Sequence, residues 1–101
     1  DVRAMAHVTG GGIAGNLPRV LPAGLGAELD RAGWPRPEVF DWLGRLGVEE
    51  DELRRVFNLG LGYLAVVPAD EADTAVRRVR ETGRDAWVVG RIVRGEGVWL
   101  R

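Results

Sequence analysis

The chain has 101 residues, 46% of them hydrophobic, and a formal net charge of −1 at pH 7. This length suits one domain with a small core, and the balanced charge gives no attraction to nucleic acid or to an acidic membrane surface. Cysteine is absent, which excludes disulfides and thiol chemistry, and no apolar run approaches the ~20 residues of a membrane span. We therefore expect a cytoplasmic protein with neither nucleic acid nor a membrane as its partner.

Residues 1–8 alternate in the way that a half-buried strand does. Val2, Ala4 and Ala6 share one face, and the residues between them share the other. The chain opens with Asp1, inside this pattern, and not with an initiating methionine. We therefore expect it to be a piece of a longer protein.

An apolar run at helical spacing, from Ile13 to Leu21, predicts the first helix. Pro18 lies inside this run, and proline removes a backbone donor and clashes with the preceding turn. The helix should therefore be short or bent at that point. Residues 27–30 are the next strand candidate.

Two helices are predicted in the middle of the chain. Pro37 suits the first turn of a helix that Gly47 ends. The following helix, over residues 49–57, begins with acidic residues and has arginines near its end, which complements the helix dipole. Its apolar residues, Leu53, Val56 and Phe57, are expected to face the core.

The second half of the chain carries the clearest strand and the clearest helix. Residues 61–67 are apolar on both faces, as is typical of a central strand. The helix over residues 69–82 begins with acids, ends with arginines and has an apolar stripe from Ala72 to Val79. Residues 86–93 form another strand, and residues 98–100 are predicted to return beside it as a hairpin.

The predicted order of elements over residues 1–101 is β-α-β-α-α-β-α-β-β. This order favours an α/β (α+β) fold in which helices pack on a mixed, partly antiparallel sheet. We expect residues 1–101 to form a single domain. The four tryptophans are most simply core or interface residues.

Three consecutive glycines, Gly10, Gly11 and Gly12, separate the first strand from the first helix. A helix start has N–H groups without internal partners and favours an anion, and glycine lets the backbone approach a phosphate closely. Thr9 could add a hydroxyl group, and Asn16 lies one turn into the helix. This segment is a candidate phosphate site, and the alternative is a plain strand-to-helix turn.

His7 and Arg19 lie on either side of this segment. A lone histidine at a strand end is usually structural, but beside a phosphate it can donate a hydrogen bond or carry a proton, so His7 is the candidate catalytic residue. Arg19 is either a solvated surface residue or a bidentate anion donor. With one histidine and no cysteine, no metal site is predicted.

The glycines match the common phosphate motifs poorly. A Walker loop is excluded because the chain has no lysine. Gly10, Gly12 and Gly15 have the G-x-G-x-x-G spacing, and Glu28 or Asp30 could serve as the acidic residue of a dinucleotide fold. A lone match of this kind is a weak signal.

A longer run carries a more specific resemblance. HVTGGGIAGNLPRVLP, residues 7–22, resembles the phosphoribosylformylglycinamidine cyclo-ligases, also called AIR synthetases. The similarity continues through PEVFDWL (residues 37–43), RVFN with the two glycines that follow (residues 55–62), and AWVVG (residues 86–90). It covers essentially the whole chain and corresponds to the later part of the C-terminal domain of these enzymes, so the N-terminal ATP-binding half is absent.

The resemblance implies an ATP-dependent ring closure in purine biosynthesis. The formamide oxygen of formylglycinamidine ribonucleotide would be phosphorylated and an amidine nitrogen would attack that carbon, giving aminoimidazole ribonucleotide, ADP and phosphate. ATP and Mg²⁺ would be bound mostly by the N-terminal half of a homodimeric enzyme. Thr9 and the three glycines would lie near the substrate or phosphate, His7 and Asn16 would orient polar groups, and Arg19 would contact an anion or lock the helix. This chain alone is expected to be inactive.

Two alternatives remain open. The first is a sister enzyme of the same ATP-binding superfamily, such as formylglycinamidine synthetase, selenophosphate synthetase or thiamine-phosphate kinase, which share a glycine-marked turn. The second is that the isolated segment is a non-catalytic folded module. The cyclo-ligase interpretation expects no ATP binding by this segment alone.

Overall fold

The computed structural model describes residues 1–101 and confirms the predicted order of elements and the α/β class. The elements are β1 (Ala4–His7), α1 (Gly12–Asn16), β2 (Leu25–Leu29), α2 (Glu38–Arg45), α3 (Glu50–Val56), β3 (Tyr63–Val66), α4 (Ala72–Glu81), β4 (Gly90–Arg94) and β5 (Val98–Leu100). Short 3₁₀ turns cover Leu17–Val20, Arg31–Gly33 and Ala69–Glu71. None of the helices combines the length and the apolar character that crossing a membrane requires.

Strands β1 and β3 form an antiparallel two-stranded ribbon. One face of the ribbon is buried through Ala6 and Leu64, which are cross-strand partners, and the opposite face is exposed. The prediction that residues 61–67 form a central strand was wrong, because β3 pairs with β1 alone and Tyr63 is 63% exposed. An apolar run cannot by itself distinguish a strand covered on both faces from a strand covered on one.

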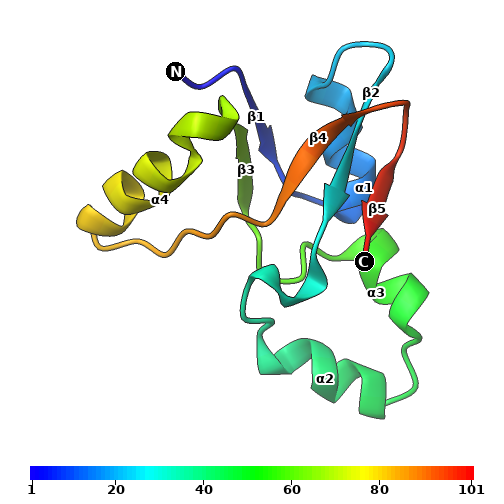
Figure 1. The fold of residues 1–101 in the computed structure, drawn as a ribbon. Coiled ribbons are helices and arrows are strands. Elements are labelled where there is room, and N and C mark those ends of the chain that lie inside the picture. Colours follow the sequence, from blue (N-terminus) through cyan, green and yellow to red (C-terminus); the bar gives the residue numbers. More distant parts are fainter.

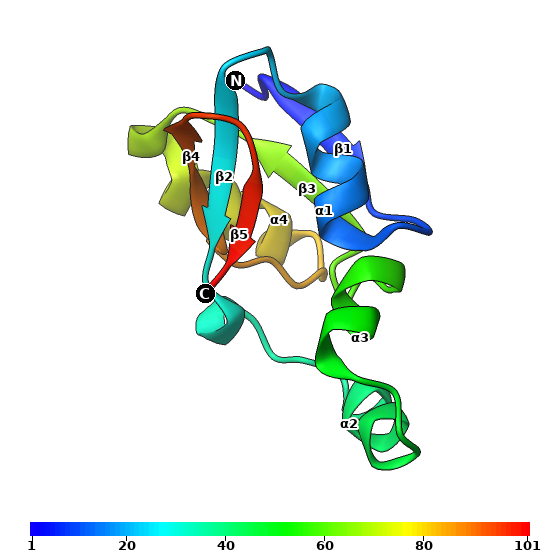
Figure 2. The same cartoon turned by 90° about the vertical axis from the view of Figure 1, so that its right-hand side faces the viewer.

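The other three strands form a mixed sheet in the order β4-β2-β5. Strand β2 lies in the centre, antiparallel to β4 and parallel to β5, and Figure 2 shows the two later strands on either side of it. A mixed, partly antiparallel sheet is therefore confirmed, but the strands divide between this sheet and the β1-β3 ribbon and do not form the single sheet that was predicted. The predicted hairpin between the last two strands was wrong, because β4 and β5 do not pair with each other.

The start of β2 explains why the last two strands separate. The turn between β4 and β5 crosses this end of β2, where Gly95 N–H donates to the Gly24 carbonyl at 2.8 Å and Ala27 N–H donates to the Gly97 carbonyl at 2.9 Å. A Cβ atom at Gly26 would lie 2.3 Å from the Gly97 oxygen and 2.4 Å from the Gly95 oxygen. The crossing therefore depends on the missing side chain of Gly26.

The first helix is short and changes type, as Pro18 predicted. The α-helical part ends at Asn16, and Leu17–Val20 continue as a 3₁₀ turn with proline in its first positions. This break confirms the prediction that the segment from Ile13 to Leu21 is short or bent. It also places Asn16 where the helix geometry changes.

The core lies between the ribbon, the three-stranded sheet and the helices α1 and α3 (Figure 1). Ile13 and Leu53 are each 1% exposed, and the buried Trp34 donates its indole N–H to the Leu59 carbonyl at 3.0 Å. Val56 and Phe57 were predicted to face the core as well, but each is 38% exposed. The last turn of α3 therefore lies at the edge of the core.

Helices α2 and α4 lie at the periphery, as Figure 1 shows. Phe40 is the buried residue of α2, and Trp42 on the same helix is 52% exposed. Helix α4 has no buried residue at all. Its predicted apolar stripe exists at helical spacing, but none of its side chains packs against the core.

Candidate functional site

The glycine run forms an exposed turn that leads from β1 into α1. Thr9, Gly10 and Gly11 are exposed, and Gly11 adopts a left-handed conformation with φ +99° directly before the helix. The N–H groups of Gly10 and Gly11 donate to no acceptor within the chain. The turn therefore presents two free backbone donors to the surroundings, which is the property that an anion site requires. Helix α1 has only five residues, so its dipole adds little.

Folding accounts for two of the three glycines. Gly11 needs its left-handed φ, and a Cβ atom at Gly12 would lie 2.3 Å from the Arg54 carbonyl oxygen and 2.9 Å from that of Phe57. Gly12 is thus required by the contact of α1 with the end of α3. Gly10 has no positive φ, and a Cβ atom there would have no neighbour within 4 Å. The fold does not explain the glycine at this position.

The buried side chain of Asn16 stabilises the glycine turn through hydrogen bonds. Its side chain is 5% exposed, and Nδ2 donates to the carbonyls of Thr9 at 3.1 Å, Gly10 at 3.3 Å and Gly12 at 2.8 Å. The Thr9 hydroxyl donates to Asn16 Oδ1 at 3.2 Å. Three carbonyl oxygens around one nitrogen fix the orientation of the amide, because an amide oxygen there could not donate.

Asn16 and Thr9 therefore direct their polar groups into the turn. The amide of Asn16 is used by backbone carbonyls, and the hydroxyl hydrogen of Thr9 is used by Asn16. Both residues were predicted to bind substrate or phosphate, and the structure places both at the segment, in contact with each other. Their side chains shape the turn, and the backbone of Gly10 and Gly11 faces outward.

His7 lies on the exposed face of the ribbon, at the end of β1. It pairs across the ribbon with Tyr63, and the two rings stack with centroids 4.5 Å apart and an interplanar angle of 9°. Stacking orients the imidazole, and His7 is exposed within this chain. Sequence reasoning missed Tyr63, because its role depends on the pairing register of strands far apart in the chain.

Arg19 lies apart from these contacts. It is exposed on the 3₁₀ turn that follows α1, and it makes no hydrogen bond or ion pair within the chain. Its guanidinium therefore keeps all its donors. The structure brings Thr9, the glycines and Asn16 together, whereas no hydrogen bond or ion pair links Arg19 to them.

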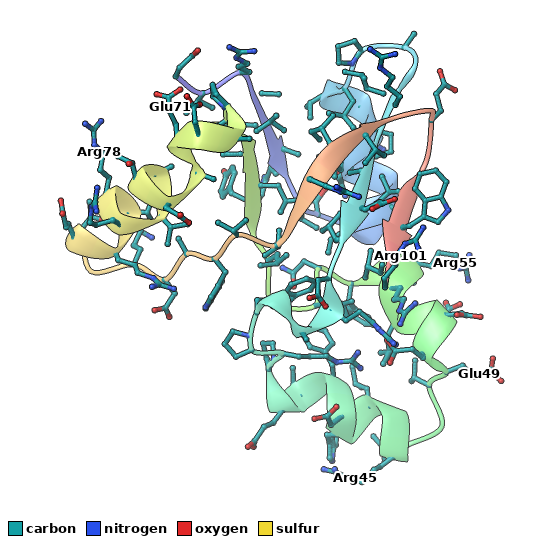
Figure 3. All side chains as sticks on the ribbon, in the orientation of Figure 1. Arg45, Glu49, Arg55, Glu71, Arg78 and Arg101 are labelled. Carbon is teal, nitrogen blue, oxygen red and sulfur yellow. The ribbon has the colours of Figure 1, made fainter.

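A shallow groove of about 500 Å³ runs between α1 and α3 beside the turn. It is lined by Gly11, Ala14, Gly15, Asp51, Arg54 and Arg55. The residues that α1 and the preceding turn contribute to this groove have small side chains or none, so the backbone of α1 is open to contact. Helix α3 contributes two guanidinium groups. Arg54 is bonded to Glu50 at 3.0 Å, and Arg55 is paired with Glu52. Figure 3 shows Arg55 pointing outward from α3.

An ion network fixes α3 against the loop before α2, and sequence reasoning did not identify it. Arg36 donates to both carboxylate oxygens of Glu50, at 3.0 and 2.8 Å, and Arg54 donates to one of them. The hydrogen bond from Arg36 is the main cause that holds the pKa of the Glu50 carboxyl below its usual value. Burial opposes this effect less strongly, and the hydrogen bond from Arg54 adds to the lowering. The network orients the helix that supports Gly12.

No group of three or more histidine, aspartate or glutamate side chains is close enough to hold a metal ion. Of the acidic residues at the start of α3, Glu50 and Glu52 are paired with arginines. These residues therefore do not fit a Mg²⁺ site.

Comparison with known proteins identifies the family of this fold. The family model described as "AIR synthase related protein, C-terminal domain" matches residues 1–100. The chain belongs to this family. The match includes the glycine turn, the supporting helix α3 and both sheets of this AIR synthase related domain.

Three curated relatives of the domain carry the same name. The chain is 55% identical over 93 residues to the phosphoribosylformylglycinamidine cyclo-ligase of Sorangium cellulosum, which covers 91% of the chain and 27% of that relative. It is 48% identical to the enzyme of the same name from Synechococcus, over 97% of the chain and 29% of the relative. It is 45% identical to the enzyme of that name from Pseudothermotoga lettingae, over 94% of the chain and 28% of the relative. The chain thus spans less than a third of the length of these relatives.

Proposed function

We propose that this domain is the C-terminal part of a phosphoribosylformylglycinamidine cyclo-ligase. The observation that supports the proposal is the 55% identity to a relative of that name over 91% of the chain. The family match over residues 1–100 includes the whole segment from His7 to Pro22. A sister enzyme of the superfamily and an inert folded module remain the alternatives that an experiment must separate.

The proposed reaction closes an imidazole ring. The formamide oxygen of formylglycinamidine ribonucleotide takes the terminal phosphoryl group of ATP, and ADP leaves. An amidine nitrogen then attacks the activated carbon, the C–O bond to phosphate breaks, and loss of a proton gives aminoimidazole ribonucleotide. Such chemistry depends on oriented donors around phosphoryl oxygens and on exclusion of water more than on a strong protein nucleophile.

In this proposal the backbone of the glycine turn binds the anion. The free N–H groups of Gly10 and Gly11 donate to a phosphate or phosphoryl oxygen, and the absence of a side chain at Gly10 lets the ligand approach. Thr9 and Asn16 keep the turn in shape through their mutual hydrogen bond. His7, oriented by Tyr63, holds or moves a proton, and Arg19 contributes a guanidinium from outside the turn.

ATP and Mg²⁺ are assigned mostly to the other part of the enzyme. The domain has no lysine for a Walker-type contact and no carboxylate cluster for a metal ion. We therefore derive no step of the ATP chemistry from these residues. The proposed holoenzyme is a cytoplasmic homodimer whose active site is completed by the preceding part of the chain.

The test uses a joined protein, in which residues 1–101 follow the part of the Sorangium cellulosum relative that precedes its own matched segment. We expect the joined protein to form aminoimidazole ribonucleotide from formylglycinamidine ribonucleotide and ATP, and the 101-residue chain alone to form none and to bind no ATP. A joined protein that is folded and binds ATP but makes no product would overturn the cyclo-ligase assignment.

Gly10→Val in the joined protein tests the role of the turn. We expect kcat/KM to fall by about a hundredfold or more, which is about 2.7 kcal/mol of transition-state stabilisation, with no loss of thermal stability. Gly44→Val is the matched control, because a Cβ atom at Gly44 in α2 would also have no neighbour within 4 Å and this residue lies outside the turn. If the Gly10→Val and Gly44→Val proteins have equal turnover, the glycine turn has a structural role only and does not bind the anion.

A further inference from the structure

Helix α4 is amphipathic but does not pack on the core of this chain. It has ten residues, none of them buried, and none of its side chains joins the core. Its apolar stripe consists of Ala72, Ala75, Val76 and Val79. The first three are half-buried, and Val79 is 40% exposed. Isolated helices shorter than about 12–15 residues are marginal in water, because most helical stability in proteins comes from packing of the apolar face.

The ribbon formed by β1 and β3 has an uncovered face. Met5 and His7 on β1 lie across from Ala65 and Tyr63 on β3, so all four side chains point to the same side. All four are exposed, with Met5 at 56% and Tyr63 at 63%. We call this the outer ribbon face.

The α4 stripe and the outer ribbon face begin at the same corner of the molecule. Ala4 at the start of β1 pairs with Val66 at the end of β3, and the amino group of Asp1 lies 3.9 Å from Glu71 Oε1 directly before α4. Figure 3 shows Glu71 beside the N-terminal segment. Residues that precede this segment in a longer family member therefore join the fold next to both surfaces.

We propose that the α4 stripe and the outer ribbon face bind the preceding part of the same polypeptide in the longer members of this family. The length of the relatives supports this occupant, since the matched segment is 27–29% of each of the three relatives named above and the family model is that of a C-terminal domain. The preceding part covers the stripe with apolar side chains and converts α4 from a marginal helix into a packed one. This inference concerns an interface and does not depend on which reaction the enzyme catalyses.

Hydrogen exchange of the 101-residue chain gives the first test. In the monomeric chain, the amides of α4 should exchange about a hundredfold or more faster than those of β2, which lies in the centre of its sheet. In the joined protein, the α4 amides should slow by about tenfold or more relative to the chain alone. Equal exchange of α4 in the two proteins, or full protection in the monomeric chain, would overturn the proposal.

A pair of substitutions on α4 gives the second test. Val76→Asp places a charge in the stripe, and Arg78→Asp places the same group on the outer side of the helix, where Figure 3 shows Arg78 pointing away from the body of the molecule. Val76→Asp should leave the melting temperature of the 101-residue chain within about 2 °C but lower that of the joined protein by about 5 °C or more. Arg78→Asp loses a favourable charge in the last turn of α4, but this loss does not involve the interface. It should therefore change the melting temperatures of the two proteins by the same amount, within about 2 °C of each other.

Two other outcomes would contradict the proposal. If Val76→Asp destabilises both proteins equally, α4 already packs within the chain. If α4 becomes protected only as the concentration of the 101-residue chain rises, and sedimentation shows a dimer, a second copy is the occupant. These experiments measure hydrogen exchange and melting temperature and need no enzymatic turnover. They therefore test the proposed interface even if the joined protein is inactive.

Discussion

Replacing Asn16 by aspartate should loosen the glycine turn. The nitrogen of the Asn16 side chain lies 2.8 Å from the Gly12 carbonyl oxygen and 3.1 Å from that of Thr9. Asn16→Asp keeps the size of the side chain but removes both N–H donors and sets a carboxylate oxygen against carbonyl oxygens. The substitution therefore separates the hydrogen-bonding role of Asn16 from its packing role.

The magnitude follows from the bonds that are lost. Two N–H bonds at about 1 kcal/mol each disappear, and buried carbonyls left without a donor cost about 1–3 kcal/mol more. We expect a loss of about 3–5 kcal/mol in the free energy of unfolding, measured by urea denaturation at pH 7. For a chain of this length, that corresponds to a fall in melting temperature of about 12–40 °C.

Asn58→Asp is the matched control. The side-chain oxygen of Asn58 accepts a hydrogen bond from Gly60 N–H at 2.8 Å, and a carboxylate accepts the same bond. The same chemical change should therefore cost little at position 58, within about 0.5 kcal/mol. If the two variants lose the same stability, the assignment of Asn16 as the donor that holds the turn is wrong.

Three further predictions concern the supports of the fold. Gly26→Ala should destabilise the chain by about 3 kcal/mol, because its Cβ would meet the carbonyl oxygens of the crossing turn, whereas Gly62→Ala, with no neighbour within 4 Å, should cost less than about 1 kcal/mol. Trp34→Phe should cost about 1–3 kcal/mol, because the Leu59 carbonyl loses its donor. Glu50→Gln should lower stability at neutral pH, where the carboxylate is charged, and this deficit should shrink as the pH falls below about 4, because hydrogen bonding to Arg36 lowers the pKa of Glu50 in the folded state.

Urea denaturation of each variant, repeated from about pH 3 to 7 for Glu50→Gln, measures these effects. A Gly26→Ala protein as stable as the Gly62→Ala protein would contradict the crossing of β2 by the last turn. A Trp34→Phe protein of unchanged stability would show that water replaces the indole donor. A deficit of the Glu50→Gln protein that is constant with pH would mean that the pKa of Glu50 is the same in the folded and unfolded states.

Local sequence determined which elements form and much of where they end. Pro18 set the change from α-helix to 3₁₀ turn after Asn16, and the acidic first turn and basic last turn marked α3 and α4. The alternation of the first residues correctly placed Ala6 inside. The segment that carries the candidate site was also visible in the sequence, because glycines, Thr9 and Asn16 lie close together along the chain.

Tertiary structure decided how the strands pair and what each polar side chain does. The position of β5 beside β2 rests on the absence of a Cβ atom at Gly26, which matters only because the turn after β4 crosses there. Asn16 was a candidate ligand by residue type, but burial and three carbonyl neighbours commit its amide to the turn. Strand pairing and burial depend on residues distant in the sequence, and a pattern of neighbouring residues carries no information about those contacts.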